Sequence, residues 1–241
     1  MRKVAIFVEG QGELIFVRQL IVKLFDQNNI SFECFELRSS FTPISVPYQF
    51  TSPNASIYFR IINVGNDERL LSAILERQKK LVESGFEILG IRDMYSRAYK
   101  KQSQEINSDV NELFIKIIND QIVKQTQNVD KIHIFFAIME LEAWFLSMPN
   151  LFKKLSPKLT PEFIHSKLGF NLTTIDPEVV FFNPAQDLDQ VFRLIGERYK
   201  KSWDEMEKIA ILIEDEDILA VTDSTKCKSF TAFVSKLIEM K

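Results

Sequence analysis

The chain has 241 residues and a mass of 28.1 kDa, a length that fits one α/β domain with a smaller subdomain. Hydrophobic residues make up 46% of the sequence and charged residues 26%, which excludes a mainly disordered chain. The net charge of −3 excludes a generally basic surface, so any contact with a polyanion requires a local basic patch.

Cysteine, histidine and long apolar runs are scarce in this sequence. Cys34 and Cys227 form neither a disulfide framework nor a zinc-knuckle spacing, which is typical of a reducing compartment. His133 and His165 are the two histidines, so a multi-histidine metal site is excluded. The longest apolar run, Ile134–Met139, is too short to cross a bilayer, and the N-terminus has no signal-peptide pattern. We therefore expect a cytoplasmic protein.

The first part of the chain predicts strands separated by helices. Apolar runs of strand length occur at Val4–Val8, Ser31–Leu37, Ile57–Val64, Phe86–Ile91 and Lys131–Met139. Apolar residues spaced by three and four predict helices over about 12–27, 67–82 and 110–122. The proline-rich segment 39–55 predicts an extended loop or an irregular hairpin, and 95–103 predicts a polar loop. The last strand is apolar on both faces, which predicts a central position in the sheet.

The second part of the chain predicts short helices separated by loops. The helices are expected at Pro161–Leu168, Pro184–Tyr199, Trp203–Ile213 and Phe230–Met240, with loops at 149–158 and 171–184. The predicted fold class is therefore α/β, a Rossmann-like, parallel-rich sheet over 1–149 with helices on both faces and a helical lobe over 150–241 packed on it. No linker marks a boundary, so one continuous domain is the alternative.

Acidic residues follow three of the predicted strands. Glu9 ends the first, Asp93 the fourth and Glu140 the fifth, with Glu142 two residues later. The carboxyl ends of parallel strands share one edge, where functional groups gather. Divalent cations need several carboxylate oxygens, and crowded carboxylates are costly without a cation. Each acid alone fits a solvated strand end or a helix N-terminus, whereas all of them together predict a metal site.

The segments around these acids resemble the motifs of DUF4276, a bacterial Toprim-like family of unknown function. Phe7–Glu13 is an apolar strand that runs into Glu-Gly, Arg92–Tyr95 resembles the family's Arg-Asp-x-Asp, and Glu140–Trp144 reads Glu-Leu-Glu-Ala-Trp. Tyr199–Lys201 resembles a C-terminal Tyr-x-Lys, and Ser229-Phe230 a final helix start. The resemblance covers nearly the whole chain.

The resemblance implies a Toprim-like catalytic core that uses Mg²⁺ or Mn²⁺, as topoisomerases, primases and overcoming-lysogenisation nucleases do. By matching positions, Glu9 is the acid/base and metal-contacting glutamate, Asp93, Glu140 and Glu142 are further metal ligands, and Lys201 is a catalytic cation. It also implies hydrolysis of phosphodiester bonds in DNA or RNA, a role in phage defence, and an ATPase partner.

Tyr95 departs from the family pattern, because it stands where the second aspartate is expected. A phenol with a pKa of about 10 is a poor Mg²⁺ ligand at neutral pH. Either the site binds fewer ions, or Glu142 compensates, or catalysis has been lost. Lost catalysis predicts a non-catalytic interaction module, and a phosphatase or phosphotransferase for a small molecule would use the same acids.

Two further motifs predict less. Gly10-x-Gly12 is an incomplete dinucleotide fingerprint, because Ile15 occupies its third small position. The acidic run Glu214–Asp217 predicts a solvated helix end.

Overall fold

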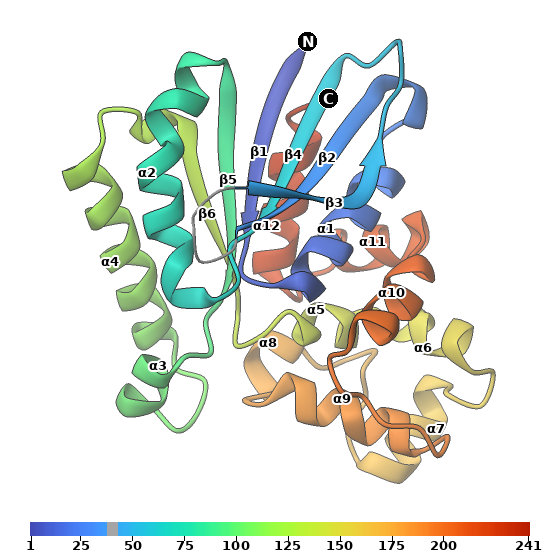
Figure 1. Ribbon diagram of the computed structural model, residues 1–241. Coiled ribbons are helices and arrows are strands. Elements are labelled where there is room, and N and C mark those ends of the chain that lie inside the picture. The colour runs from blue at the N-terminus through green and yellow to red at the C-terminus, as the bar shows by residue number, and fades with distance from the viewer. Residues whose placement is uncertain (38–42) are drawn as a thin grey trace. The chain divides into compact units, whose positions relative to one another are not determined.

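The protein is described here by a computed structural model that covers residues 1–37 and 43–241, without the side chains of Pro47 and Asp67 (Figure 1). By their contacts these residues form two compact units. The sheet unit comprises 1–92, 111–136 and 236–241, and the helical unit comprises 93–110 and 137–235.

The strands of the sheet unit form one mixed sheet in the order β3-β2-β4-β1-β5-β6. Their bounds are Arg2–Val8 for β1, Ile30–Leu37 for β2, Pro43–Phe50 for β3, Ile57–Asn63 for β4, Phe86–Asp93 for β5 and Ile132–Ala137 for β6. Strand β1 pairs in parallel with β4 and β5, β2 pairs in parallel with β4, and β3 is antiparallel to β2. Val4–Val8 in β1 is fully buried, as expected for a central parallel strand.

The crossover connections place helices on both faces of this sheet. Helix α1 (Gln11–Leu24) connects β1 to β2 in one direction across the sheet, and α2 (Leu70–Glu83) connects β4 to β5 in the opposite direction. Because parallel crossovers are right-handed, the two helices cover opposite faces. Helix α4 (Ser108–Gln125), which precedes β6, lies beside α2 on the same face (Figure 1). The connection that leaves β1 runs toward β2, whereas the one that leaves β5 runs in the opposite direction toward β6. In such folds, ligands bind at the carboxyl ends of the strands where the connections diverge in this way.

Helix α2 packs closely on β5 because of Gly90. A Cβ atom at this position would lie 2.6 Å from Cδ1 of Ile134 and 3.0 Å from Cδ1 of Ile74. The approach is tighter than any side chain at position 90 would allow, so glycine is required there.

The predicted α/β class with a mostly parallel, Rossmann-like sheet is confirmed, with three corrections in detail. Pro43–Phe50 is a strand that pairs with β2 across a bulge, so of the two readings of 39–55 the irregular hairpin is correct; residues 39–42 lie outside the described ones. Strand β6 lies at the edge of the sheet, not at its centre, since packing against neighbouring elements also covers an edge strand. The predicted polar loop contains α3 (Arg97–Gln102), which Ser96 caps by accepting from the backbone N–H of Tyr99.

The helical unit contains more helices than the sequence predicts. Their bounds are Glu142–Leu146 for α5, Pro149–Leu155 for α6, Pro161–Leu168 for α7, Pro177–Val180 for α8, Pro184–Arg193 for α9, Trp203–Ile211 for α10, Asp215–Thr222 for α11 and Lys228–Ile238 for α12, which ends in the sheet unit. Helices α6 and α8 fall in predicted loops, and α9 ends six residues before Tyr199. These helices are too short to show a clear apolar periodicity in the sequence. Proline at the first helical position and side-chain caps determine where they start.

Buried aromatic side chains form the core of the helical unit. Trp144 of α5 packs with its ring centroid 5.4 Å from that of Phe230 and 6.0 Å from that of Phe233, both on α12. The indole N–H donates to Ser229 Oγ at 2.9 Å and to Glu178 Oε1 at 3.1 Å. Short helices far apart in sequence are thereby fixed to α5, which begins at Glu142.

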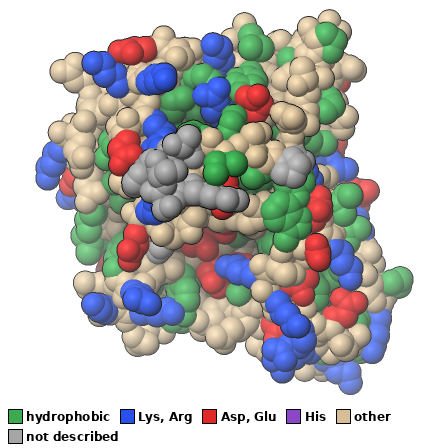
Figure 2. Space-filling view, viewed as in Figure 1, with side chains coloured by type: hydrophobic (Ala, Val, Ile, Leu, Met, Phe, Trp, Pro, Cys, Tyr) green, Lys and Arg blue, Asp and Glu red, His purple; other side chains and the backbone are tan. Residues whose placement is uncertain are grey.

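The surface carries charges of both signs. Figure 2 shows Lys and Arg side chains interspersed with Asp and Glu side chains over the visible face, in keeping with the small net charge. None of the helices within 1–37 and 43–241 has the length and apolarity needed to cross a membrane.

Candidate functional site

The chain that leaves β5 is held against the segment that follows β6. The N–H of Met94 donates to Ala137 O at 2.9 Å, and the N–H of Tyr95 donates to Met139 O at 2.7 Å. Asp93 Oδ1 accepts from the N–H of Leu141 at 3.0 Å. These contacts fix Asp93 beside the turn that carries Glu140.

That turn contains a backbone conformation that is unfavourable for its residue. Met139 is fully buried and has φ of 64°, in the left-handed region that costs a non-glycine residue about 1–2 kcal/mol. Such outliers persist where the surrounding structure over-determines them, often at functional sites. Here the turn places Glu140 before α5 and Glu142 in its first turn.

Glu142 is completely buried in the helical unit. Its Oε1 accepts a hydrogen bond from the Tyr199 hydroxyl at 2.6 Å, and its Oε2 lies 3.1 Å from Lys201 Nζ. A buried carboxylate is costly unless it is paired and hydrogen-bonded, and these two partners meet that need. Tyr199 is itself 7% exposed, so the phenol fixes the position of the carboxylate from within the core.

The ammonium of Lys201 lies where the carboxylates converge. Nζ is 3.1 Å from Glu142 Oε2, 3.4 Å from Glu140 Oε1 and 3.9 Å from Asp93 Oδ2. The Lys201 side chain is 40% exposed, and its backbone has φ of 55°. We call Asp93, Glu140, Glu142 and Lys201 the Lys201 cluster.

Glu140 extends this cluster toward α9. Its Oε2 accepts from the N–H of Ala185, in the first turn of α9, at 3.2 Å. Burial, followed by repulsion from the negative charge of Glu140, raises the pKa of nearby Asp187 to about 6. The neighbourhood is therefore rich in negative charge, as expected for a site that accepts a cation.

The Lys201 cluster suits a hard divalent cation. Carboxylate oxygens from Asp93, Glu140 and Glu142 surround one point, and oxygen ligands are those that Mg²⁺ and Mn²⁺ prefer. A cation at that point would take the place of the Lys201 ammonium, whose partly exposed side chain has room to move toward solvent. Binding of the predicted ion by these residues stays a prediction.

Glu9, the remaining predicted ligand, lies in the sheet unit. It follows β1, whose Val8 pairs with Ile91 of β5, and its Oε1 is 3.6 Å from Nε of Arg92. Glu9 is 8% exposed, so this pairing holds the carboxylate largely out of water at the end of the strand. Its convergence with the Lys201 cluster stays a prediction.

Tyr95, which stands in place of the expected aspartate, contacts other groups. Its hydroxyl donates to Asn183 Oδ1 at 2.5 Å, and its ring packs edge-on against Phe182 at 5.5 Å between centroids. Lys100 Nζ lies 3.9 Å from the centroid of the same ring. Tyr95 therefore anchors the start of α9, which carries the backbone N–H that contacts Glu140.

Sequence reasoning missed two contributors to this site. Tyr199 belongs to the Tyr-x-Lys motif, but the sequence does not indicate its role, because the hydrogen bond to Glu142 forms only in the folded chain. Asp187 gave no signal, because an acid in the first turn of a helix usually reflects the helix dipole.

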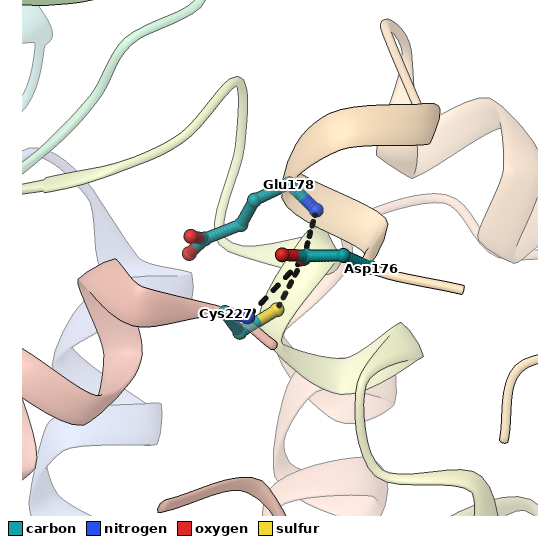
Figure 3. A group of neighbouring side chains, drawn as sticks. All are labelled: Asp176, Glu178 and Cys227. Carbon is teal, nitrogen blue, oxygen red and sulfur yellow. Dashed lines mark hydrogen bonds between the residues drawn. The ribbon is translucent and has the colours of Figure 1, made fainter. Parts of the chain in front are cut away.

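A second group of candidate metal ligands lies elsewhere in the helical unit. Figure 3 shows Asp176 accepting from the backbone N–H groups of Glu178 at 3.0 Å and of Cys227 at 3.1 Å, while Cys227 Sγ lies 3.7 Å from Asp176 Oδ1. Glu178 accepts from Trp144 and Ser229. Burial, followed by the negative charges of Glu178 and Asp176, raises the pKa of the Cys227 thiol, which disfavours the thiolate that binds metals. These contacts describe a structural network that joins α8 to the start of α12.

Fold and cluster together define an α/β protein whose mostly parallel sheet leads into a group of convergent carboxylates. The family described as "Domain of unknown function (DUF4276)" matches residues 8–238, and the chain belongs to this family. No curated protein and no solved structure matches the chain. The predicted family membership is confirmed, whereas the relationship to Toprim proteins stays a prediction.

Proposed function

We propose that this protein is a Mg²⁺- or Mn²⁺-dependent hydrolase of phosphodiester bonds in DNA or RNA. The observation that carries the proposal is the convergence of Asp93, Glu140 and Glu142 on one cation, the Lys201 ammonium. Carboxylates brought together from separate segments around a cation are what metal-dependent phosphodiester chemistry requires.

The three carboxylates differ in burial, and we assign their roles accordingly. Asp93 and Glu140 keep part of their carboxylates accessible and would hold a metal ion, while buried Glu142 is fixed by Tyr199 and completes the set. A divalent ion bound there supplies neutralisation of phosphate charge and a water of lowered pKa. The half-exposed side chain of Lys201 would be available to contact a phosphate oxygen of the substrate. Glu9 is the proposed proton acceptor or donor.

The first test is metal binding. Calorimetry should detect Mn²⁺ binding to the unmodified protein, and Asp93→Asn and Glu140→Gln should each weaken it at least ~10-fold, the usual effect of losing a group that orients or holds a metal. The matched control is Glu216→Gln, which neutralises an acid near a different lysine, Lys154. Equal Mn²⁺ affinity in all variants would contradict the proposed ligands.

The second test is cleavage. Supercoiled DNA, single-stranded RNA and a small aryl phosphodiester, each with Mn²⁺, distinguish the three substrate classes. Glu9→Gln should reduce cleavage by ~100-fold or more, the scale of a positioned acid/base group. Undiminished cleavage by Glu9→Gln would show that another residue, or a contaminant, is responsible.

The alternative is a non-catalytic interaction module that partners an ATPase. Lys201 favours this alternative to some extent, because its ammonium already offsets the acids, and so does Tyr95 in place of an acid. Absence of Mn²⁺ binding and of cleavage in the unmodified protein, with the ATPase present, would establish the alternative.

A further inference from the structure

In the part of the chain that the structure describes, helices cover one face of the sheet over only part of its width. Helix α1 covers the opposite face, and α2 and α4 lie over β1, β5 and β6. By register Phe35 of β2 neighbours Ile62 of β4, and Lys3 neighbours both Tyr58 and Phe86, so these side chains share the face on which α2 lies. Beside α2, the β2 and β4 part of that face forms the floor of a groove.

The groove is mostly apolar and of ligand size. It has a volume of about 500 Å³, within the range of small-molecule sites. Phe35, Ile62 and Phe86 form its apolar floor, and Leu81 of α2 forms an apolar wall. Ile62, Phe86 and Leu81 are buried, whereas Phe35 is half-buried, so Phe35 is the floor residue that the groove leaves most accessible.

Arg60 sits on this floor among aromatic rings. The centre of its guanidinium lies 5.0 Å from the ring centroid of Phe86, 5.5 Å from that of Phe35 and 5.8 Å from that of Tyr58. Its Nη2 donates weakly to the Tyr58 hydroxyl at 3.4 Å, and that hydroxyl in turn donates to Glu33. The rings stabilise the cation through their faces but accept none of its in-plane N–H donors.

One donor of Arg60, Nε, has no acceptor among the described residues, 1–37 and 43–241. This nitrogen is also buried. A buried charged donor without an acceptor is costly, and an anion is the natural acceptor for a planar guanidinium.

The wall of the groove adds further positive charge. Arg77 and Lys80 of α2 line it together with Arg60, and the acid that lines it in the described structure is Glu76. Arg77 Nη1 is 3.1 Å from Glu76 Oε2, which partly offsets that acid. The groove is thus locally positive although the protein has a net charge of −3.

We propose that this groove binds a flat organic anion, an aromatic ring that carries a carboxylate or a phosphate. The ring lies on the Phe35, Ile62 and Phe86 floor, and its anionic group accepts from Arg60, with Lys80 supplying attraction from the rim. None of the residues that line this groove takes part in the metal-dependent reaction proposed above.

The test is an NMR titration of the full-length protein with four probes. The anions are 2-naphthoate and adenosine monophosphate, and the matched neutral probes are 2-naphthamide and adenosine. We expect one anion to shift the resonances of Phe35, Ile62 and Leu81 and to bind at least ~10-fold more tightly than its neutral partner, the scale of a hydrogen bond to a charged group. Which anion binds distinguishes an aromatic carboxylate from a nucleotide as the source.

Variants separate Arg60 from general electrostatics. Arg60→Gln should weaken binding of the anion ~10-fold or more while leaving the neutral probe unchanged. If Arg60→Gln does not fold, the proposal is tested with Lys80→Glu and with Lys79→Glu as its control. Both lysines are exposed, but Lys80 lines the groove and Lys79 does not. Lys80→Glu should weaken anion binding several-fold and Lys79→Glu should not. Equal affinity for anions and neutral probes, equal effects of the two lysine variants, or shifts that map elsewhere would each overturn the proposal.

Discussion

Two lysines in the helical unit are each surrounded by carboxylates, and they differ in how those carboxylates are assembled. Lys154 Nζ lies 2.7 Å from Glu214 and Asp217 and 3.1 Å from Glu216, all within one short stretch at the start of α11. The Lys201 contacts are longer, between 3.1 and 3.9 Å, and join acids from separate segments.

The surroundings of the two lysines also differ. Glu214 and Asp217 form a capping box at the start of α11. These two acids near Lys154 therefore stabilise the helix N-terminus whether or not the lysine is present. Around Lys201 the backbone is instead unfavourable, with positive φ at Met139 and at Lys201 itself. A tight, locally built cluster is typical of a stabilising contact, whereas a looser one assembled by strained segments is typical of a site kept for function.

The largest expected effect separates the clusters by activity. Glu142→Gln should lower Mn²⁺-dependent cleavage by ~100-fold or more, because a ligand held by Tyr199 is lost. Asp217→Asn, which changes the equally buried acid of the Lys154 cluster, should leave cleavage intact. The measurement is initial cleavage rate under saturating Mn²⁺, with folding checked by circular dichroism. Comparable losses in both variants would end the distinction between a functional and a structural cluster.

The next effect concerns stability. Lys154→Met should lower the free energy of unfolding by ~2–4 kcal/mol, because it leaves buried Asp217 without its cation. Lys201→Met also leaves a buried carboxylate, Glu142, without its cation, but it should cost somewhat less, ~1–3 kcal/mol, because the Tyr199 hydroxyl still donates to Glu142 and the Lys201 contacts are longer.

Divalent ions provide the control for these two variants. Added Mn²⁺ should stabilise Lys201→Met against urea more than it stabilises the unmodified protein, since the competing ammonium is gone, and it should not rescue Lys154→Met. Rescue of both variants, or of neither, would contradict a cation site at Lys201.

A third effect is the pH dependence of stability near α9. The pKa of Asp187 is raised to about 6, so the folded protein holds a proton that the unfolded chain has released between about pH 4 and 6. Stability therefore falls as pH rises through this window, and Asp187→Asn should raise the free energy of unfolding at pH 7 by about 1 kcal/mol.

Asp189 is the matched control with the opposite sign. Burial alone would raise its pKa, but hydrogen bonds from Tyr199 N–H, Arg198 and Arg193 outweigh burial and lower the pKa below its ordinary value. Its contribution is present above the ordinary pKa and is lost as pH falls below it. Urea titrations of Asp187→Asn and Asp189→Asn across pH 3–8 should thus differ in sign, and matching slopes would refute the assignment.

The smallest effect tests Tyr95. Tyr95→Asp should raise Mn²⁺ affinity by a few-fold by adding an acid to the segment that carries Asp93, at the cost of the hydrogen bond to Asn183, which is worth about 1 kcal/mol. Tyr95→Phe, which loses that bond without adding charge, is the control. Equal Mn²⁺ affinity in the two variants would mean that Tyr95 is not a degenerate ligand position.

Strong local patterns predicted much of the fold. The apolar runs at Val4–Val8 and Phe86–Ile91 became β1 and β5, because a continuous apolar stretch of that length has few other ways to bury itself. The predicted central position of β6 was wrong, and the predicted solvated helix end at Glu214–Asp217 is confirmed for Glu214, Asp215 and Glu216 but not for Asp217. β6 lies at an edge, and Asp217 is buried against Lys154 instead of being solvated, since local charge does not reveal a distant lysine.

The sequence by itself determined the alternation of strands and helices, the acids that follow the strands and the motifs of the DUF4276 family. The tertiary structure alone decided that Lys201 lies among Asp93, Glu140 and Glu142, and that Tyr199 holds Glu142. Secondary structure follows from neighbours in the chain, and periodicity records those neighbours. A cluster that joins Asp93, Glu140 and Lys201 depends on how turns such as the one at Met139 direct the chain, and no local sequence pattern records that.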